Sequence, residues 1–238
     1  MPAKYRLKTF EVGKIYHIYN RSLDEREVFG GGDEYELMER LLKQYLTEYV
    51  PAEDGRFKGE KPYRIRHKQE MVLKGKVDLV AYCLMPDHIH LLLAERESGA
   101  ITRLLRRILT YYSMEYNRKR KRRGPVFLGT FKAAAVEGDE LLKAVSRLIH
   151  LNPVVKSIRR FALVETVAGS RLDEYRYSSY QDYVSGQKRD FVNSEPILNL
   201  FGGDNKESRQ AYRNYVEKTQ EKLEKTEELM MDIITEKR

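Results

Sequence analysis

Residues 77–94 read VDLVAYCLMPDHIHLLLA, two apolar runs separated by a Pro-Asp turn. Val77–Leu84 and His88–Ala94 are each predicted to form a strand, and the turn makes them neighbours in one sheet. Side chains in a strand alternate between the two faces, so His88 and His90 point the same way. Two neighbouring imidazoles can bind one divalent metal ion, although a His-x-His pair alone is weak evidence for a metal site.

The chain has 238 residues, of which 41% are hydrophobic, enough for the core of one large domain. A single cysteine, Cys83, excludes an internal disulfide and fits a reducing compartment. No run of eighteen apolar residues is present, so we expect no membrane partner and a cytoplasmic location.

The positive charges are concentrated in one part of the chain. The formal net charge is +8, and residues 118–123 (RKRKRR) form an unbroken basic block after a predicted helix rich in Tyr and Arg. This distribution favours a nucleic acid partner over the alternative of a solvated loop. The candidate nucleic-acid-binding residues are Arg103, Arg106, Arg107, Arg118, Lys119, Arg120, Lys121, Arg122, Arg123 and Lys132.

The remaining periodicities predict the order β-α-β-β-α-β, followed by further helices. This order indicates an α+β fold, a ferredoxin-like α/β sandwich with an antiparallel sheet and helices on one face. Residues 1–185 are expected to form this domain, with a variable insertion at about 50–75. Residues 186–238 are expected to form a C-terminal helical extension. The predicted elements outside the quoted stretch are strands at 15–20 and within 124–135, and helices at 33–49, 101–117 and 139–151, the last ending near Pro153.

The last of these helices offers a third metal ligand. Leu141, Val145, Leu148 and Asn152 fall on one helical stripe. An amide on an apolar stripe needs a partner, because burying it unpaired costs about 1–3 kcal/mol. A metal held by the two histidines is one such partner, and a helix cap before Pro153 is an equal alternative.

Five collinear motifs together resemble those of the single-tyrosine HUH transposases, especially the branch of REP-associated tyrosine transposases. The similarity extends from about residue 16 to residue 183. The motifs are YHIYNR at 16–21, AYCLMPDHIH at 81–90, VFLGTFK at 126–132, IHLNPV at 149–154 and YSSY at 177–180.

The resemblance implies a ferredoxin-like enzyme of DNA transposition that cuts and rejoins single-stranded or hairpin DNA. In the family, the residues matching His88, His90 and Asn152 bind Mg²⁺ or Mn²⁺, which polarises a phosphodiester. A tyrosine one helical turn before the amide attacks phosphorus and forms a 5′-phosphotyrosine. The resemblance also implies a nucleoid-associated monomer or homodimer.

The chain departs from the family at the nucleophile, because Leu148 stands where the tyrosine is expected. Leucine has no nucleophilic atom, so we expect covalent cleavage to be impaired. One alternative is an active endonuclease that uses a relocated tyrosine, with Tyr111, Tyr112 and Tyr116 as candidates whose simpler role is packing or base stacking. Another is a domesticated nucleic-acid-binding regulator without enzymatic activity.

Overall fold

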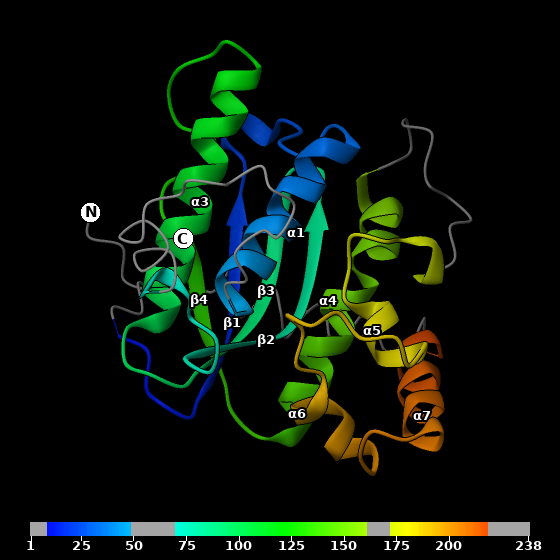
Figure 1. The fold of residues 1–238 in the computed structure, drawn as a ribbon. Helices are drawn as coiled ribbons and strands as arrows, with labels where there is room; N and C mark the ends of the chain where they lie inside the picture. Colours follow the sequence, from blue (N-terminus) through cyan, green and yellow to red (C-terminus); the bar gives the residue numbers. More distant parts are fainter. Residues whose placement is uncertain (1–8, 49–69, 161–171, 219–238) are drawn as a thin grey trace, which may run out of the picture.

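The computed structural model describes residues 9–48, 70–160 and 172–218 (Figure 1). Its centre is an antiparallel sheet in the order β2-β3-β1-β4. The strands are β1 (Ile15–Arg21), β2 (Val77–Met85), β3 (His88–Glu95) and β4 (Lys132–Val136). The sequence of elements confirms the predicted β-α-β-β-α-β order and the α+β fold. Most of the predicted insertion lies outside the described residues.

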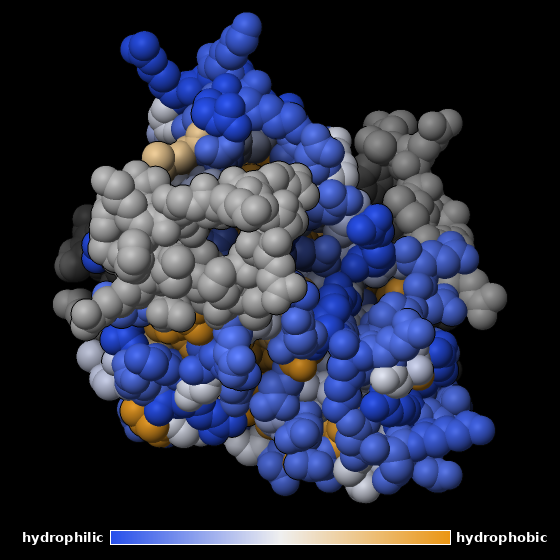
Figure 2. Space-filling model, in the orientation of Figure 1, coloured by the Kyte–Doolittle hydropathy of each residue, from blue (hydrophilic) through white to orange (hydrophobic). Residues whose placement is uncertain are grey.

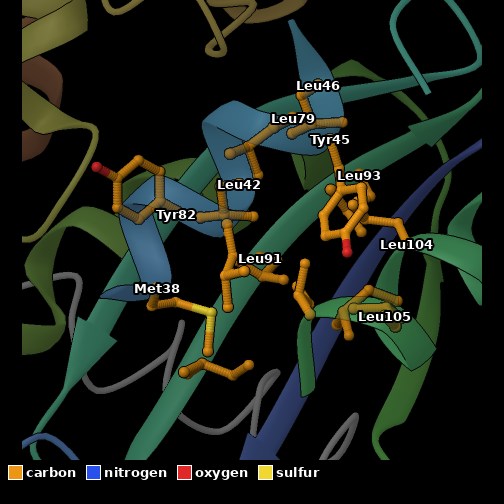
Figure 3. Packing of buried hydrophobic residues seen from close by; sticks show 14 of the residues in the cluster. Met38, Leu42, Tyr45, Leu46, Leu79, Tyr82, Leu91, Leu93, Leu104 and Leu105 are labelled. Carbon is orange, nitrogen blue, oxygen red and sulfur yellow. The ribbon is translucent and has the colours of Figure 1, made fainter. Parts of the chain in front are cut away.

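Two helices cover one face of the sheet, as expected. They are α1 (Gly32–Leu46) and α3 (Ala100–Lys119). Their apolar stripes pack against the side chains that alternate onto this face, including Leu91 and Leu93 of β3 (Figure 3). We call this side the α1/α3 face.

The second face is covered as well, by α4 (Asp139–Arg160) and by helices that follow it. These are α5 (Tyr180–Val184), α6 (Glu195–Leu198) and α7 (Lys206–Glu217), so the beginning of the C-terminal extension packs into the second core. We call this side the α4 face. Within the described ranges, no helix is long and apolar enough to cross a bilayer.

The connection from β3 to α3 depends on one buried carboxylate. Glu95, the last residue of β3, accepts hydrogen bonds from the backbone N–H groups of Ala100 (3.1 Å) and Ile101 (2.8 Å). A carboxylate there satisfies helix N–H groups that lack an intrahelical partner and complements the helix dipole. This cap fixes where α3 begins relative to the strand that carries the two histidines.

The helix predicted at 139–151 does not end near Pro153 as expected, because α4 continues through Pro153 to Arg160. Proline inside a helix removes one hydrogen bond and costs about 3 kcal/mol. The turn before it is anchored by the buried side chains of Leu148, Ile149 and Leu151, and this packing offsets that cost. Asn152 therefore lies inside the helix, and the alternative that it caps a helix end is excluded.

Candidate metal and nucleic-acid site

Three buried imidazoles meet on the α4 face, and we call them the imidazole cluster: His17 of β1 with His88 and His90 of β3. The rings of His88 and His90 are 4.9 Å apart between centroids, which confirms that both point to one face. His17 stacks on His90 at 5.1 Å, and its Nε2 lies 2.9 Å from Nδ1 of His90. The sequence left the direction of His17 open.

Strand register brings the side chain of Tyr19 to the cluster. One row across the sheet runs from Cys83 through His90 and Tyr19 to Lys132. The Tyr19 ring lies 5.1 Å from the His90 ring and 5.8 Å from the His88 ring. Sequence reasoning missed Tyr19, although the alternation in β1 already placed it on the same face as His17.

Hydrogen bonds orient the His88 ring. The buried Asp87 carboxylate accepts from Nδ1 of His88, with Oδ1 at 2.8 Å, and this leaves the lone pair of the ring at Nε2. That Nε2 lies 3.4 Å from Oδ1 of Asn152. Nε2 of His88 and Oδ1 of Asn152 thus face each other across the gap between sheet and helix. From the sequence, a turn role for Asp87 is favoured over the alternative that it supports the metal ligand.

The protonation states suit metal binding. Burial lowers the pKa of His17 to about 4. Burial also lowers the pKa of His90 well below its ordinary value, and the neighbouring His88, His17 and Arg21 lower it further. Both rings are therefore neutral at pH 7, when their lone pairs can bind a cation.

The donor set of two imidazoles and one amide fits a divalent ion. The 3.4 Å between Nε2 of His88 and Oδ1 of Asn152 is compatible with two ligand atoms about 2.0–2.1 Å from one ion. In the part of the chain that the structure describes, no three His, Cys, Asp or Glu side chains could hold a metal together. A three-ligand site at the cluster consequently depends on the amide.

Leu148 lies one helical turn before Asn152 and is buried in the apolar core of the α4 face. Its side chain packs there with apolar residues such as Cys83 and Val145. The position at which the resemblance leads us to expect a nucleophilic tyrosine is thus filled by a buried hydrocarbon side chain.

The structure does not bring the three tyrosines of α3 to the imidazole cluster. Tyr112 and Tyr116 belong to the core of the α1/α3 face, and burial raises the pKa of Tyr112. Their hydroxyls donate to backbone carbonyls, of Val28 at 2.5 Å and of Glu27 at 3.2 Å. Tyr111 is exposed on the same helix.

The basic block divides into two groups. Lys119 pairs with Asp33 and Glu34, and Arg120 pairs with Glu34, so these two cations fasten the end of α3 to the start of α1. Arg118 pairs with Glu115 on its own helix. These contacts are structural, although the exposed pairs contribute little stability individually.

The other cations of the block are more available. Arg122 donates to Asn117 at 3.2 Å, whereas Lys121 and Arg123 are exposed and have no ion pair among the described residues. Figure 2 shows hydrophilic side chains gathered around the end of α3, at the top of the view. This end of the helix is the more accessible basic surface.

The arginines within α3 also differ. Arg103 pairs with Glu97, and Arg107 donates to the carbonyl of Met71 at 2.5 Å. Arg106 is exposed and has no ion pair within the described ranges. Lys132 is exposed at the start of β4, on the α4 face beside Tyr19.

One comparison with known families covers the segment that carries His88 and His90. Residues 57–151 match the family described as "Transposase IS200 like", which confirms the family resemblance seen in the motifs. Members of such a family act on DNA. The matched range contains both histidines and ends one residue before Asn152.

No curated protein matches the chain. One similar solved structure is described as a REP-associated tyrosine transposase bound to a REP hairpin. It is 12% identical, with a TM-score of 0.49, and the similarity covers 85% of this chain and 98% of the other.

Proposed function

We propose that this protein is a transposase-family protein that binds single-stranded or hairpin DNA and a divalent metal, and that has lost the family's covalent cleavage step. One observation carries the proposal: Nε2 of His88 faces Oδ1 of Asn152 at 3.4 Å, while buried Leu148 lies one turn away. The ligands of the family persist, and the attacking phenol is absent from its position.

His88, His90 and Asn152 would hold Mg²⁺ or Mn²⁺. Such an ion supplies Lewis-acid polarisation of a phosphodiester when bound. Asp87 orients the His88 ring through the 2.8 Å hydrogen bond, and His17 contacts the His90 ring at 2.9 Å. These two residues therefore position the ligands.

The DNA contacts would come from cations that no acidic residue neutralises. Among the candidates in the described ranges, the exposed ones without an ion pair are Arg106, Lys121, Arg123 and Lys132, whereas Lys119 and Arg120 hold α3 against α1. If each neutralises one phosphate of a single strand, log K falls with log salt at a slope of roughly −3. The family match supports DNA as the polyanion.

A titration of a labelled hairpin with a single-stranded flank tests the proposal. We expect binding to strengthen with Mn²⁺ in the natural protein and to lose this dependence in His88→Ala/His90→Ala. Tyr111→Phe is the matched control, because it removes an exposed hydroxyl on the opposite face. Absence of DNA binding with and without metal would refute the proposal.

A second candidate function is strand cleavage through Tyr19. The observation in its favour is the position of this half-exposed phenol beside the rings of His88 and His90. A covalent protein–DNA band formed by the natural protein, and lost in Tyr19→Phe but not in Tyr111→Phe, would establish it. If the protein is a regulator without enzymatic activity, no such band should form and the affinity for nucleic acid should not depend on Mn²⁺. The affinities for DNA and for RNA are measured side by side in this test.

A further inference from the structure

A surface groove of about 550 Å³ runs between α3 and the segment Pro125–Phe131 that leads into β4. Its size lies in the range of small-molecule sites. The groove is on the α1/α3 side of the sheet, so it is separate from the imidazole cluster.

The lining of the groove combines an apolar floor with a polar rim. Leu105 and Phe127 form buried parts of the lining, and the half-buried Phe131 adds a second aromatic ring. Hydroxyls of Thr110 and Thr130 stand at exposed positions around them.

Two further groups make the groove suited to a nucleotide. Arg106 lines the groove and has no ion pair among the described residues. Asn20 accepts from the Arg21 backbone N–H at 3.0 Å through Oδ1, and its Nδ2 has no partner within the described contacts. The groove thus offers one cation, a side-chain amide donor and several hydroxyls above a largely apolar floor.

We propose that this groove binds one unpaired nucleotide of the DNA strand. This proposal rests on the proposed function of single-stranded DNA binding. A nucleobase has apolar faces that pack on aromatic side chains and polar edges that bond to hydroxyls and amides. Arg106 is placed to pair with the attached phosphate. A base stacked within a duplex cannot enter, so the ligand is a nucleotide outside the stem.

The sheet edge links the groove to the imidazole cluster. β4 is an edge strand, and its register sets Lys132 beside Tyr19 on the α4 face. The preceding residue, Phe131, lines the groove on the other side. A single strand of DNA that crosses this edge of the sheet can contact Phe131 with a base and Lys132 with a phosphate.

The inference is tested by measuring how the full chain binds a labelled oligothymidylate of twelve nucleotides in which one position at a time lacks its base. In the natural protein, we expect one abasic position to weaken binding about tenfold, because base–aromatic stacking is lost there. Thr110→Trp fills the groove from an exposed position. It should weaken binding of the intact strand about tenfold, and removing a base should then cause no further loss of affinity. Tyr111→Trp, an adjacent exposed residue outside the groove lining, is the matched control.

A second pair of variants tests the phosphate contact. Arg106→Ala should make the salt slope about 0.7 less steep, whereas Arg103→Ala should leave it unchanged. Equal affinities of Thr110→Trp and Tyr111→Trp, with no sensitive abasic position, would overturn the groove assignment while leaving DNA binding intact. A changed oligomeric state in Thr110→Trp with unchanged DNA binding would assign the groove to a protein contact instead. Absence of any binding by the natural protein would refute the proposed function itself.

Discussion

The two faces of the sheet have different chemistry. On the α1/α3 face, Leu91 and Leu93 pack into an apolar core, and the buried phenols of Tyr112 and Tyr116 donate to backbone carbonyls. On the α4 face, the same strand contributes His88 and His90. Alternation along one strand therefore separates an apolar, stabilising surface from the surface that carries the proposed ligands.

The difference indicates which face is functional. Burying imidazoles costs free energy unless they find partners, and apolar residues would stabilise the fold more simply. The cluster residues are partnered mainly with one another and with Asp87, and Nε2 of His88 faces Oδ1 of Asn152. Polar groups kept at such a cost are expected where a ligand binds.

The largest expected effect is the loss of metal binding on the α4 face. His90→Ala removes one of three proposed ligands, so we expect Mn²⁺ binding measured by calorimetry to fall below detection. Tyr112→Phe on the other face should leave the Mn²⁺ affinity unchanged, even though it lowers stability. Equal Mn²⁺ affinities of His90→Ala and the natural protein would remove the ligand assignment.

A substitution in the core of the α1/α3 face should have the opposite pattern, a loss of stability without a loss of metal binding. Leu42 is fully buried in its core, so Leu42→Ala should lower the free energy of unfolding by about 2–5 kcal/mol. Its Mn²⁺ affinity at a temperature where the variant is folded should stay unchanged. Urea denaturation and calorimetry measure the two quantities, and a parallel loss of both would show that the faces are not independent.

A smaller effect is expected for the residue that orients His88. Asp87→Asn keeps the size of the side chain but weakens the hydrogen bond to Nδ1, so Mn²⁺ affinity should fall about 10–100-fold. Asp33→Asn, at an exposed ion pair with Lys119, is the matched control. An unchanged affinity in Asp87→Asn would give this carboxylate a turn role only.

The last prediction concerns His150 of α4, which contacts Tyr212 and Ser179, each at 2.7 Å. Burial lowers its pKa from 6.5 to about 3. The unfolded chain binds the proton more readily, so stability contributed by the neutral ring is present above about pH 6.5 and is lost as pH falls toward 3.

Between pH 6 and 4, the free energy of unfolding should therefore decrease by up to about 1.4 kcal/mol per pH unit from this residue. Urea denaturation at several pH values measures the slope. His150→Asn should flatten it, and an identical slope in the variant would show that the ring titrates normally in the folded protein.

The sequence predicted those parts of the site that depend on local alternation. The facing of His88 and His90 followed from spacing within one strand, and Asn152 followed from one helical stripe. The position of Tyr19 beside the histidines depends on the pairing of β1 with β3, and the sequence does not specify this pairing. The extent of α4 was mispredicted because core packing outweighed the local preference of Pro153.

The basic block shows a further limit of sequence reasoning. Six consecutive positive charges predicted one nucleic-acid surface, yet Lys119 contacts Asp33, which lies 86 residues away in the chain. Only the folded chain distinguishes cations that hold α3 to α1 from cations such as Arg123 that face solvent.

The most direct test of the central account is Leu148→Tyr in the presence of Mn²⁺ and labelled single-stranded DNA. Denaturing electrophoresis and mass spectrometry would detect a covalent protein–DNA species and its attachment site. We predict that the natural protein binds DNA without forming this species, and that the variant forms it through position 148. A covalent species of equal yield from the natural protein would contradict the account, because the attacking group would then still be present.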